Sequence, residues 1–493
     1  MTVLLLAVAA IGFGLVTIVA APYRRRIAVA IGVVGSLAVA GIALSMPSEE
    51  SLAIGGVGIV GTPLVREMAV LWSAGLAALG LLEVGVGGRP TVVGPGLVGL
   101  AVAVVALATR DPASSVAALA AGGVAGILVP GLSGWLEGPE SPARLPTTSR
   151  GSQAILGSGL LGLAVIAFGA SAAGPLGAGA VAPNDPDVRL VAGLALLGMV
   201  AAVAIRCGLI PLHVWAARFM EGVSPLAIPA AFAWGGAAFV LVAIDWSQVT
   251  LGPTAAGTSE RFLIIGLSFV SLVLGGLAAM VHDDIEHVLG YSILQDAGVA
   301  VLAFASLEPE VAAAARNWLV ASATIKTALA AWAAVVRSTY GGHRLADLGG
   351  WARHSPVLGV SFAAILVAAV GLPGIAIWES RSSLIGSAMP GLDWIATPLI
   401  ALMPAIYLGR IALAGVEPIG QAVAAGPSGR PRWTGGRALG WSEGGRLDVL
   451  RAIPSEVRAN RVPLMALGVL LLAAMAVLTA IGGTGGPVAP VGP

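Results

Sequence analysis

The chain is a succession of long apolar runs separated by short polar links. Runs of about twenty residues recur along its whole length, and each is long enough to cross a hydrocarbon layer of roughly 30 Å. This pattern predicts about fourteen transmembrane helices in a single domain covering residues 1–493. The first run, from Thr2 to Ala21, has no positively charged segment before it, so we interpret it as a first span rather than a cleaved signal. The predicted fold class is an all-α polytopic membrane protein.

The composition supports this fold class. Hydrophobic residues make up 57% of the chain, charged residues 10%, and the mean hydropathy is +0.94. A soluble domain cannot bury that much apolar surface. The formal charge of +1, spread between the apolar runs, argues against nucleic acid as a partner, whereas a lipid bilayer is the expected surroundings.

The positions of arginine predict the orientation. Arginines gather in alternate links, and the richest segment, 415–461, is an Arg/Gly-rich stretch before the last helix. Because cytoplasmic links carry an excess of positive charge, we interpret 415–461 as a cytoplasmic linker. An even number of spans then places both termini outside the cell (inner) membrane.

The chain offers few residues for cofactor chemistry. Cys207 is the one cysteine, and His282, His287, His343 and His354 fall in or beside predicted links. These residues leave too few candidates for an iron–sulfur cluster or a haem inside the bilayer, and no P-loop is present. We therefore expect no cofactor, no metal and no catalytic centre, so the energy must come from an ion gradient or a partner.

The strongest functional signal is an ionisable pair inside predicted spans. Lys326, the only lysine, lies near the middle of the run 317–336. A charge at that depth costs about 2.5–3.5 kcal/mol on insertion scales, so its presence indicates a proton or ion path. Asp296 on the preceding span is the expected partner, and each charge changes the proton affinity of the other. The alternative is that Lys326 and Asp296 form a purely structural pair.

Two predicted helices are interrupted by proline. Pro211 and Pro373 each follow a glycine in an otherwise apolar run, and Trp215 or Trp378 comes a few residues later. Proline removes a backbone hydrogen bond and leaves carbonyl groups that need other partners. In transporters, two such breaks in corresponding halves indicate a pathway near the middle of the bilayer and an internal inverted repeat.

Charged or titratable residues accompany both breaks. Arg206 precedes the first break, and Glu379 and Arg381 follow the second. Arg206 lies close enough to the end of its span that its side chain could instead extend to the cytoplasm. His213 and Glu221 follow the first break and could either titrate in a pathway or lie at the membrane interface.

At these residues the chain resembles the family of proton-conducting antiporter-like subunits. That family includes the large membrane subunits of complex I, the Mrp-type cation/proton antiporters and the energy-converting hydrogenases. Segment 206–225 contains a Gly-x-x-Pro-x-His-x-Trp pattern typical of the family, and segments 284–292, 324–329 and 371–381 are similar to its later motifs. The resemblance implies a core of fourteen helices with two inverted repeats, each containing a proline-broken helix.

The departures from the family pattern concern its charged residues. Arg206 and Arg381 stand where the family has residues that can release a proton, and arginine stays charged at any relevant pH. Ala120 and Ala231 stand near positions where the family has a glutamate and a histidine or lysine. Lys326 matches the family lysine.

The sequence leaves more than one function open. The favoured function is a proton- or cation-translocating, non-redox subunit of a complex I-like, NADH–quinone oxidoreductase-type assembly, with other membrane subunits and a peripheral redox module as partners. The alternatives are an Mrp-type cation/proton antiporter subunit and a scaffold that no longer conducts. The expected proton pathway consists of Lys326, Asp296, His213, Arg206, Arg381, Glu221 and Glu379, with helix breaks at Pro211 and Pro373.

Overall fold

The computed structural model is almost entirely helical in the part of the chain that it describes. Described are residues 1–47, 50–54, 57–86, 92–111, 186–213, 216, 224–251, 257–340, 344–345, 348–417 and 455–483. The described α-helices are α1 (Thr2–Ala20), α2 (Arg25–Leu44), α3 (Pro63–Val86), α4 (Val93–Ala108), α7 (Pro186–Cys207), α9 (Gly235–Thr250), α10 (Thr258–Val281), α11 (Ile285–Val301), α12 (Pro309–Tyr340), α13 (Trp351–His354), α14 (Pro356–Val370), α15 (Ala376–Ala388), α16 (Asp393–Val416) and α19 (Ser455–Gly482).

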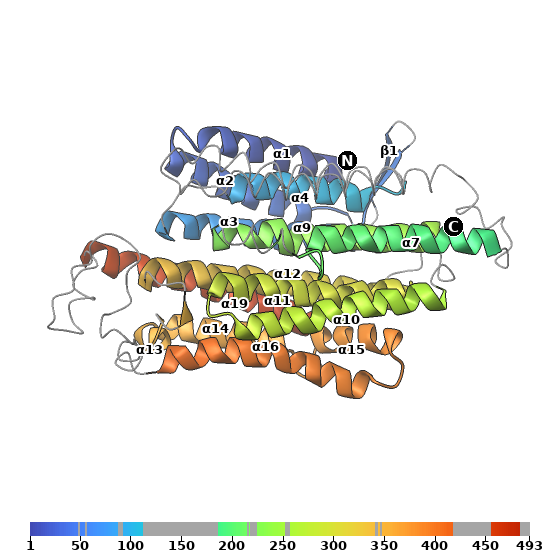
Figure 1. The fold of residues 1–493 in the computed structure, drawn as a ribbon. Coiled ribbons are helices and arrows are strands. Elements are labelled where there is room, and N and C mark those ends of the chain that lie inside the picture. The colour runs from blue at the N-terminus through green and yellow to red at the C-terminus, as the bar shows by residue number, and fades with distance from the viewer. Residues whose placement is uncertain are drawn as a thin grey trace.

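The long helices run along one common direction and form a single bundle (Figure 1). Among the described residues, ten helical segments are long and apolar enough to cross a membrane, and the apolar helices α4 and α14 are shorter, at 10–17 residues. Length and composition together therefore identify a polytopic membrane protein, as the sequence predicts.

Helix α12 forms the centre of the bundle. It packs against α3 and α9 from the first half of the chain and against α11, α14, α15 and α19 from the second. Every residue of its apolar window is buried inside the protein. Its run of alanines explains this position, because small side chains let neighbouring helices approach closely. Lys326, which lies within this window, consequently faces protein rather than lipid.

The helices that precede Pro211 and Pro373 each end in a glycine turn. Helix α7 ends at Cys207, and Gly208 turns the chain with a φ of 66°. Helix α14 ends at Val370, where Gly371 has a φ of 68°, and α15 continues after the turn. Residues with side chains rarely adopt such angles, so glycine favours both turns. The turns contain Pro211 and Pro373, and Trp378 lies in α15 as expected, while Trp215 lies outside the described residues.

Beyond the first break, the chain resumes in short, irregular helical turns. A 3₁₀ turn, η1 (Pro225–Ala227), leads into a π-helical turn, η2 (Pro229–Trp234), which continues directly into α9. A second 3₁₀ turn, η4 (Leu302–Ala305), extends α11. Single π-helical turns are frequent at functional sites because they free backbone groups from the regular ladder.

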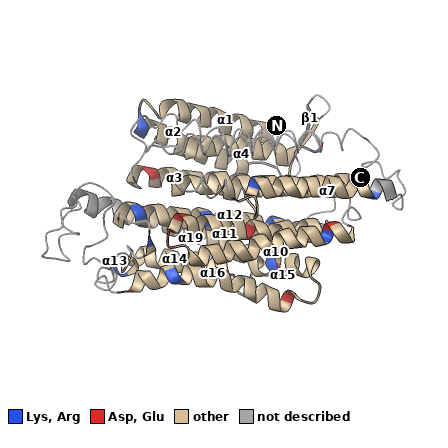
Figure 2. Cartoon of the chain, in the orientation of Figure 1, with Lys and Arg blue, Asp and Glu red and all other residues tan. Residues whose placement is uncertain are grey.

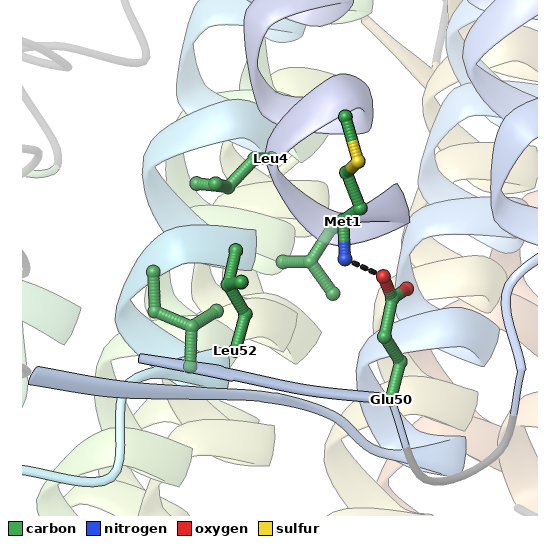
Figure 3. Close-up of a pocket in the computed structure, with 6 residues that line it drawn as sticks. Met1, Leu4, Glu50 and Leu52 are labelled. Atoms are coloured by element: carbon green, nitrogen blue, oxygen red, sulfur yellow. Dashed lines mark ion pairs between the residues drawn. The ribbon is translucent and has the colours of Figure 1, made fainter. Parts of the chain in front are cut away.

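A β-hairpin is the part of the fold that the all-α prediction misses. Strands β1 (Glu50–Ile54) and β2 (Val57–Gly61) pair antiparallel between α2 and α3. Glu50 accepts hydrogen bonds from the Thr2 backbone N–H at 2.8 and 2.9 Å and pairs with the amine of Met1. Figure 3 shows this contact in a small pocket beside Leu4 and Leu52. The hairpin thus holds the beginning of α1.

The structure changes the bounds of the linker predicted at 415–461. Helix α16 continues to Val416, and α19 begins at Ser455, so helix extends into both ends of that segment. Residues 418–454 lie outside the described part of the chain. The arginines near residue 460 therefore belong to the first turns of the last helix.

Candidate functional site

Lys326 and Asp296 form a buried ion pair at the centre of the bundle. The Lys326 Nζ lies 3.0 Å from the Asp296 Oδ2, and the two side chains are 3% and 17% exposed. Lys326 is close to the middle of α12, and Asp296 lies in the neighbouring helix α11. The pairing predicted from the sequence is therefore present.

Arg381 lies next to this pair and is held by the second helix break. Its side chain, 1% exposed, donates hydrogen bonds to the carbonyl oxygens of Val370 at 2.9 Å and Ala369 at 3.2 Å. These carbonyls close α14, where a helix end leaves oxygens without intrahelical partners and carries partial negative charge. Arg381 interacts electrostatically with Asp296. The carbonyl oxygens at the second break therefore bind a permanent positive charge.

Trp318 connects Arg381 to the ion pair. The Arg381 guanidinium carbon lies 5.0 Å from the centre of the Trp318 ring, which favours a cation over its face. The Trp318 indole N–H donates to the backbone carbonyl of Asp296 at 2.9 Å. One side chain of α12 thus contacts both the guanidinium and the helix that carries the carboxylate.

Sequence reasoning missed Tyr407, which also belongs to this cluster. Tyr407 in α16 is 1% exposed, lies near Ser292, and interacts electrostatically with Asp296 and Arg381. Ser292 and Asp296 are four residues apart on α11 and so share one helix face. The available signal was a tyrosine, one of only four in the chain, inside an apolar run. We name Lys326, Asp296, Arg381, Trp318 and Tyr407 the central cluster.

Arg206 occupies a separate buried position at the first break. It is 7% exposed and donates a hydrogen bond to the carbonyl oxygen of Ala231 at 2.9 Å. The alternative that Arg206 extends to the membrane surface is therefore wrong. Ala231 belongs to the π-helical turn η2, and Gly235 leaves the space that the guanidinium fills, because a Cβ there would lie 2.6 Å from Arg206 Nη2.

The same π-helical turn contacts the residue beside Lys326. The Trp234 indole N–H donates to the Thr327 hydroxyl at 2.9 Å, and Trp234 stacks on Trp72 with ring centroids 5.7 Å apart. A sequence of contacts therefore leads from Arg206 through η2 to α12. The charged positions of Figure 2, along the bundle as well as at its ends, show how sparse such charges are.

The remaining predicted site residues lie apart from the central cluster. Glu379 is exposed, and its carboxylate accepts the Gly374 N–H at 3.2 Å, so it caps the turn of the second break. His213 is partly buried after the first break, with its ring 6.4 Å from that of Tyr291. Glu221 and Ala120 lie outside the described residues. Within the described part of the chain, no three His, Cys, Asp or Glu side chains are arranged to hold a metal ion.

Part of the chain is similar in sequence to known membrane subunits. Residues 185–403 match the family described as NADH:quinone oxidoreductase/Mrp antiporter, TM. NADH-quinone oxidoreductase subunit N of Cereibacter sphaeroides is 30% identical over 253 residues, covering 50% of this chain and 54% of that protein. The chain spans about half the length of the curated relatives that it matches.

Solved structures share the fold over nearly the whole chain. A chain of respiratory complex I from Thermus thermophilus has a TM-score of 0.67 and 19% identity, with 98% of this chain and 100% of that chain covered. A chain of the Mrp complex from Dietzia sp. DQ12-45-1b has a TM-score of 0.65 and 17% identity, with 98% and 94% covered.

Fold and site first define a class, a polytopic helical membrane protein in which two helices end at glycine turns and charges are buried at the centre. Residues 185–403 then match the model of one family of such proteins. Over this segment the chain is similar to the antiporter-like membrane subunits that its sequence motifs resemble.

Proposed function

We propose that the chain is a proton-translocating, non-redox membrane subunit of a complex I-like assembly driven by electron transfer. In this proposal it lies in the cell membrane with both termini outside, among other membrane subunits and a peripheral redox module. The names of the relatives support the proposal, since those with the matching segment are NADH-quinone oxidoreductase subunits N.

The observation that carries the proposal is the Lys326–Asp296 pair, with 3.0 Å between Nζ and Oδ2 in the interior of the bundle. Buried ion pairs contribute little net stability, because the loss of hydration offsets their attraction. Ionisable groups kept at such depth usually mark ion or proton paths. A lysine and an aspartate in contact can exist as an ion pair or as two neutral groups, and the two forms differ only in the position of one proton.

Two arginines supply permanent positive charges that do not release protons. Arg381 cannot release a proton, and its bonds to the end of α14 hold it beside Asp296. Arg206 fixes a second positive charge at the first break, against η2. We propose that protons exchange at Lys326 and Asp296, while Arg381 and Arg206 change the proton affinity of the pair without titrating.

One observation favours the scaffold alternative. Arg206, which is permanently charged, and Ala231 stand at two positions where the family has titratable residues. Instead of a relay between two titratable side chains, Arg206 donates a hydrogen bond to the Ala231 backbone. A subunit that had lost conduction but still held its neighbours would retain the bundle and the ion pair as structure.

Purification in mild detergent followed by transport measurement tests the proposal. The redox-driven function requires that iron–sulfur subunits co-purify and that vesicles containing the complex take up protons during electron transfer. Co-purification of small membrane subunits alone would indicate an Mrp-like antiporter. Unchanged proton uptake by a Lys326→Ala complex would indicate the scaffold.

A further inference from the structure

Three of the five histidines gather around one tyrosine at an end of the bundle. The rings of His282 and His287 are stacked with centroids 4.9 Å apart, and His282 stacks on Tyr291 at 5.1 Å. Tyr291 is also 6.5 Å from His287 and 6.4 Å from His213. We name His213, His282, His287 and Tyr291 the histidine cluster.

The histidine cluster connects a surface link to the first helix break. His282 lies in the link between α10 and α11, His287 in the first turn of α11, and Tyr291 one turn further. At a rise of about 1.5 Å per residue, Tyr291 is roughly 10 Å deeper than the link. His213 comes from the segment after α7, so the deepest part of the cluster reaches the interruption itself.

One carboxylate lies within ion-pair distance of the histidine cluster. Asp284 Oδ1 lies 3.7 Å from His287 Nδ1. The other carboxylates nearby pair with arginines. Asp283 pairs with Arg410 of α16 at 2.8 Å, and Glu286 pairs with Arg337 of α12. A backbone β-bridge between Asp284 and Arg344 brings a further positively charged residue to the link.

The stacked rings of His282 and His287 favour binding one proton rather than two. Burial and the neighbouring His287 lower the pKa of His282, and Asp284 and Asp283 offset only part of this effect. A proton on one of the two stacked rings therefore opposes a second. The Nδ1 of His213 is buried without a hydrogen-bond partner among the described residues, so one ring nitrogen is available at the deep end of the cluster.

We propose that the histidine cluster is a proton-collecting site that supplies the first helix break from the membrane surface at the Asp283–Asp284 link. The inference rests on the proposed function. An imidazole nitrogen forms an N–H bond with a proton from surface water. That N–H bond then breaks, and the proton passes toward the first helix break. The exchange needs no oxidant or further reactant. Histidine suits this task because its ordinary pKa lies between about 5 and 8.

Glutamine variants of the surface histidines test the proposal in vesicles containing the whole complex. We expect His282→Gln combined with His287→Gln to reduce proton uptake several-fold above about pH 7, where protons are scarce, and to leave it near the wild-type rate in acid. His354→Gln is the matched control, since His354 bonds instead with the Tyr340 hydroxyl at 2.9 Å. It should keep the wild-type pH profile.

The outcomes separate this inference from the proposed function. A wild-type pH profile of proton uptake in the double variant, together with loss of uptake in Lys326→Ala, would overturn only the role proposed for the histidine cluster. Absence of uptake in the wild-type complex would overturn the proposed function. Histidine ring resonances of the isotope-labelled complex give a second readout, because the cluster predicts that the His287→Gln change shifts the titration of His282 and leaves that of His354 unchanged. An unshifted titration of His282 would contradict the shared proton.

Discussion

Replacing Asp296 by asparagine should destabilise the protein far more than the loss of an ordinary ion pair. The substitution keeps the shape of the side chain but leaves Lys326, only 3% exposed, without its counter-charge. Removing one partner of a buried pair costs about 3–5 kcal/mol. Asp296 is 17% exposed, so we expect the lower end, about 3 kcal/mol, in the free energy of unfolding.

Helix α12 provides a matched control for this substitution. Arg316 in α12 pairs with Asp245 at 2.7 Å, but the two side chains are 16% and 39% exposed. An ion pair that reaches solvent contributes about 1 kcal/mol or less, so Asp245→Asn should have a small effect. Chemical unfolding of the purified full chain in mixed micelles, followed by circular dichroism, gives both values.

Two results would refute this reasoning. The first is an equal loss of unfolding free energy in Asp296→Asn and Asp245→Asn, because burial would then not decide the cost. The second comes from combining Asp296→Asn with Lys326→Met, which removes the stranded charge and should recover part of the stability. A double variant less stable than Asp296→Asn would show that Lys326 is not stranded by the single change.

Three further predictions follow from other parts of the structure. Gly235→Ala should displace Arg206 from the Ala231 carbonyl and cost about 1.5–3 kcal/mol, the value of a hydrogen bond from a charged donor, whereas Gly266→Ala, with nothing within 4 Å, should be neutral in the same unfolding assay. Because the pKa of His282 is lowered on folding, the unfolded chain binds its proton more readily, and stability should fall as the pH drops below about 6.5; thermal unfolding of His282→Gln should show a shallower loss, and an unchanged slope would contradict this. A reporter fused within 415–461 should behave as cytoplasmic and one fused after Pro493 as external, and finding both on one side would contradict the span count.

Much of the site could be predicted because its signals are local in the sequence. A single lysine in an apolar run, an aspartate in the preceding run and two glycine–proline turns stand out without any knowledge of packing. The ion pair of Lys326 and Asp296 and the breaks at Pro211 and Pro373 follow from these signals. The sequence of the hairpin after α2 also contains such a signal, the dipeptide Gly55–Gly56, because Gly-Gly favours tight hairpins.

The rest depends on how helices are rotated against each other, which one sequence does not specify. Tyr407 and Trp318 could each have faced lipid or the interior. The burial of Arg206 depends on the π-helical turn that exposes the Ala231 carbonyl, and periodicity does not reveal such a turn. The sequence identifies His282 and His287 only as residues of links, because they are connected to His213 through Tyr291, which is about eighty residues away from His213 in the chain.

The most direct test of the central claim compares two substitutions of Lys326 in proton uptake by vesicles containing the whole complex. If Lys326 acts by losing and regaining a proton, Lys326→Arg should preserve assembly and electron transfer yet abolish uptake, since guanidinium stays charged. Lys326→Ala should abolish uptake as well. Uptake at the wild-type rate by the arginine variant would contradict the account, because a fixed charge at that position would then suffice.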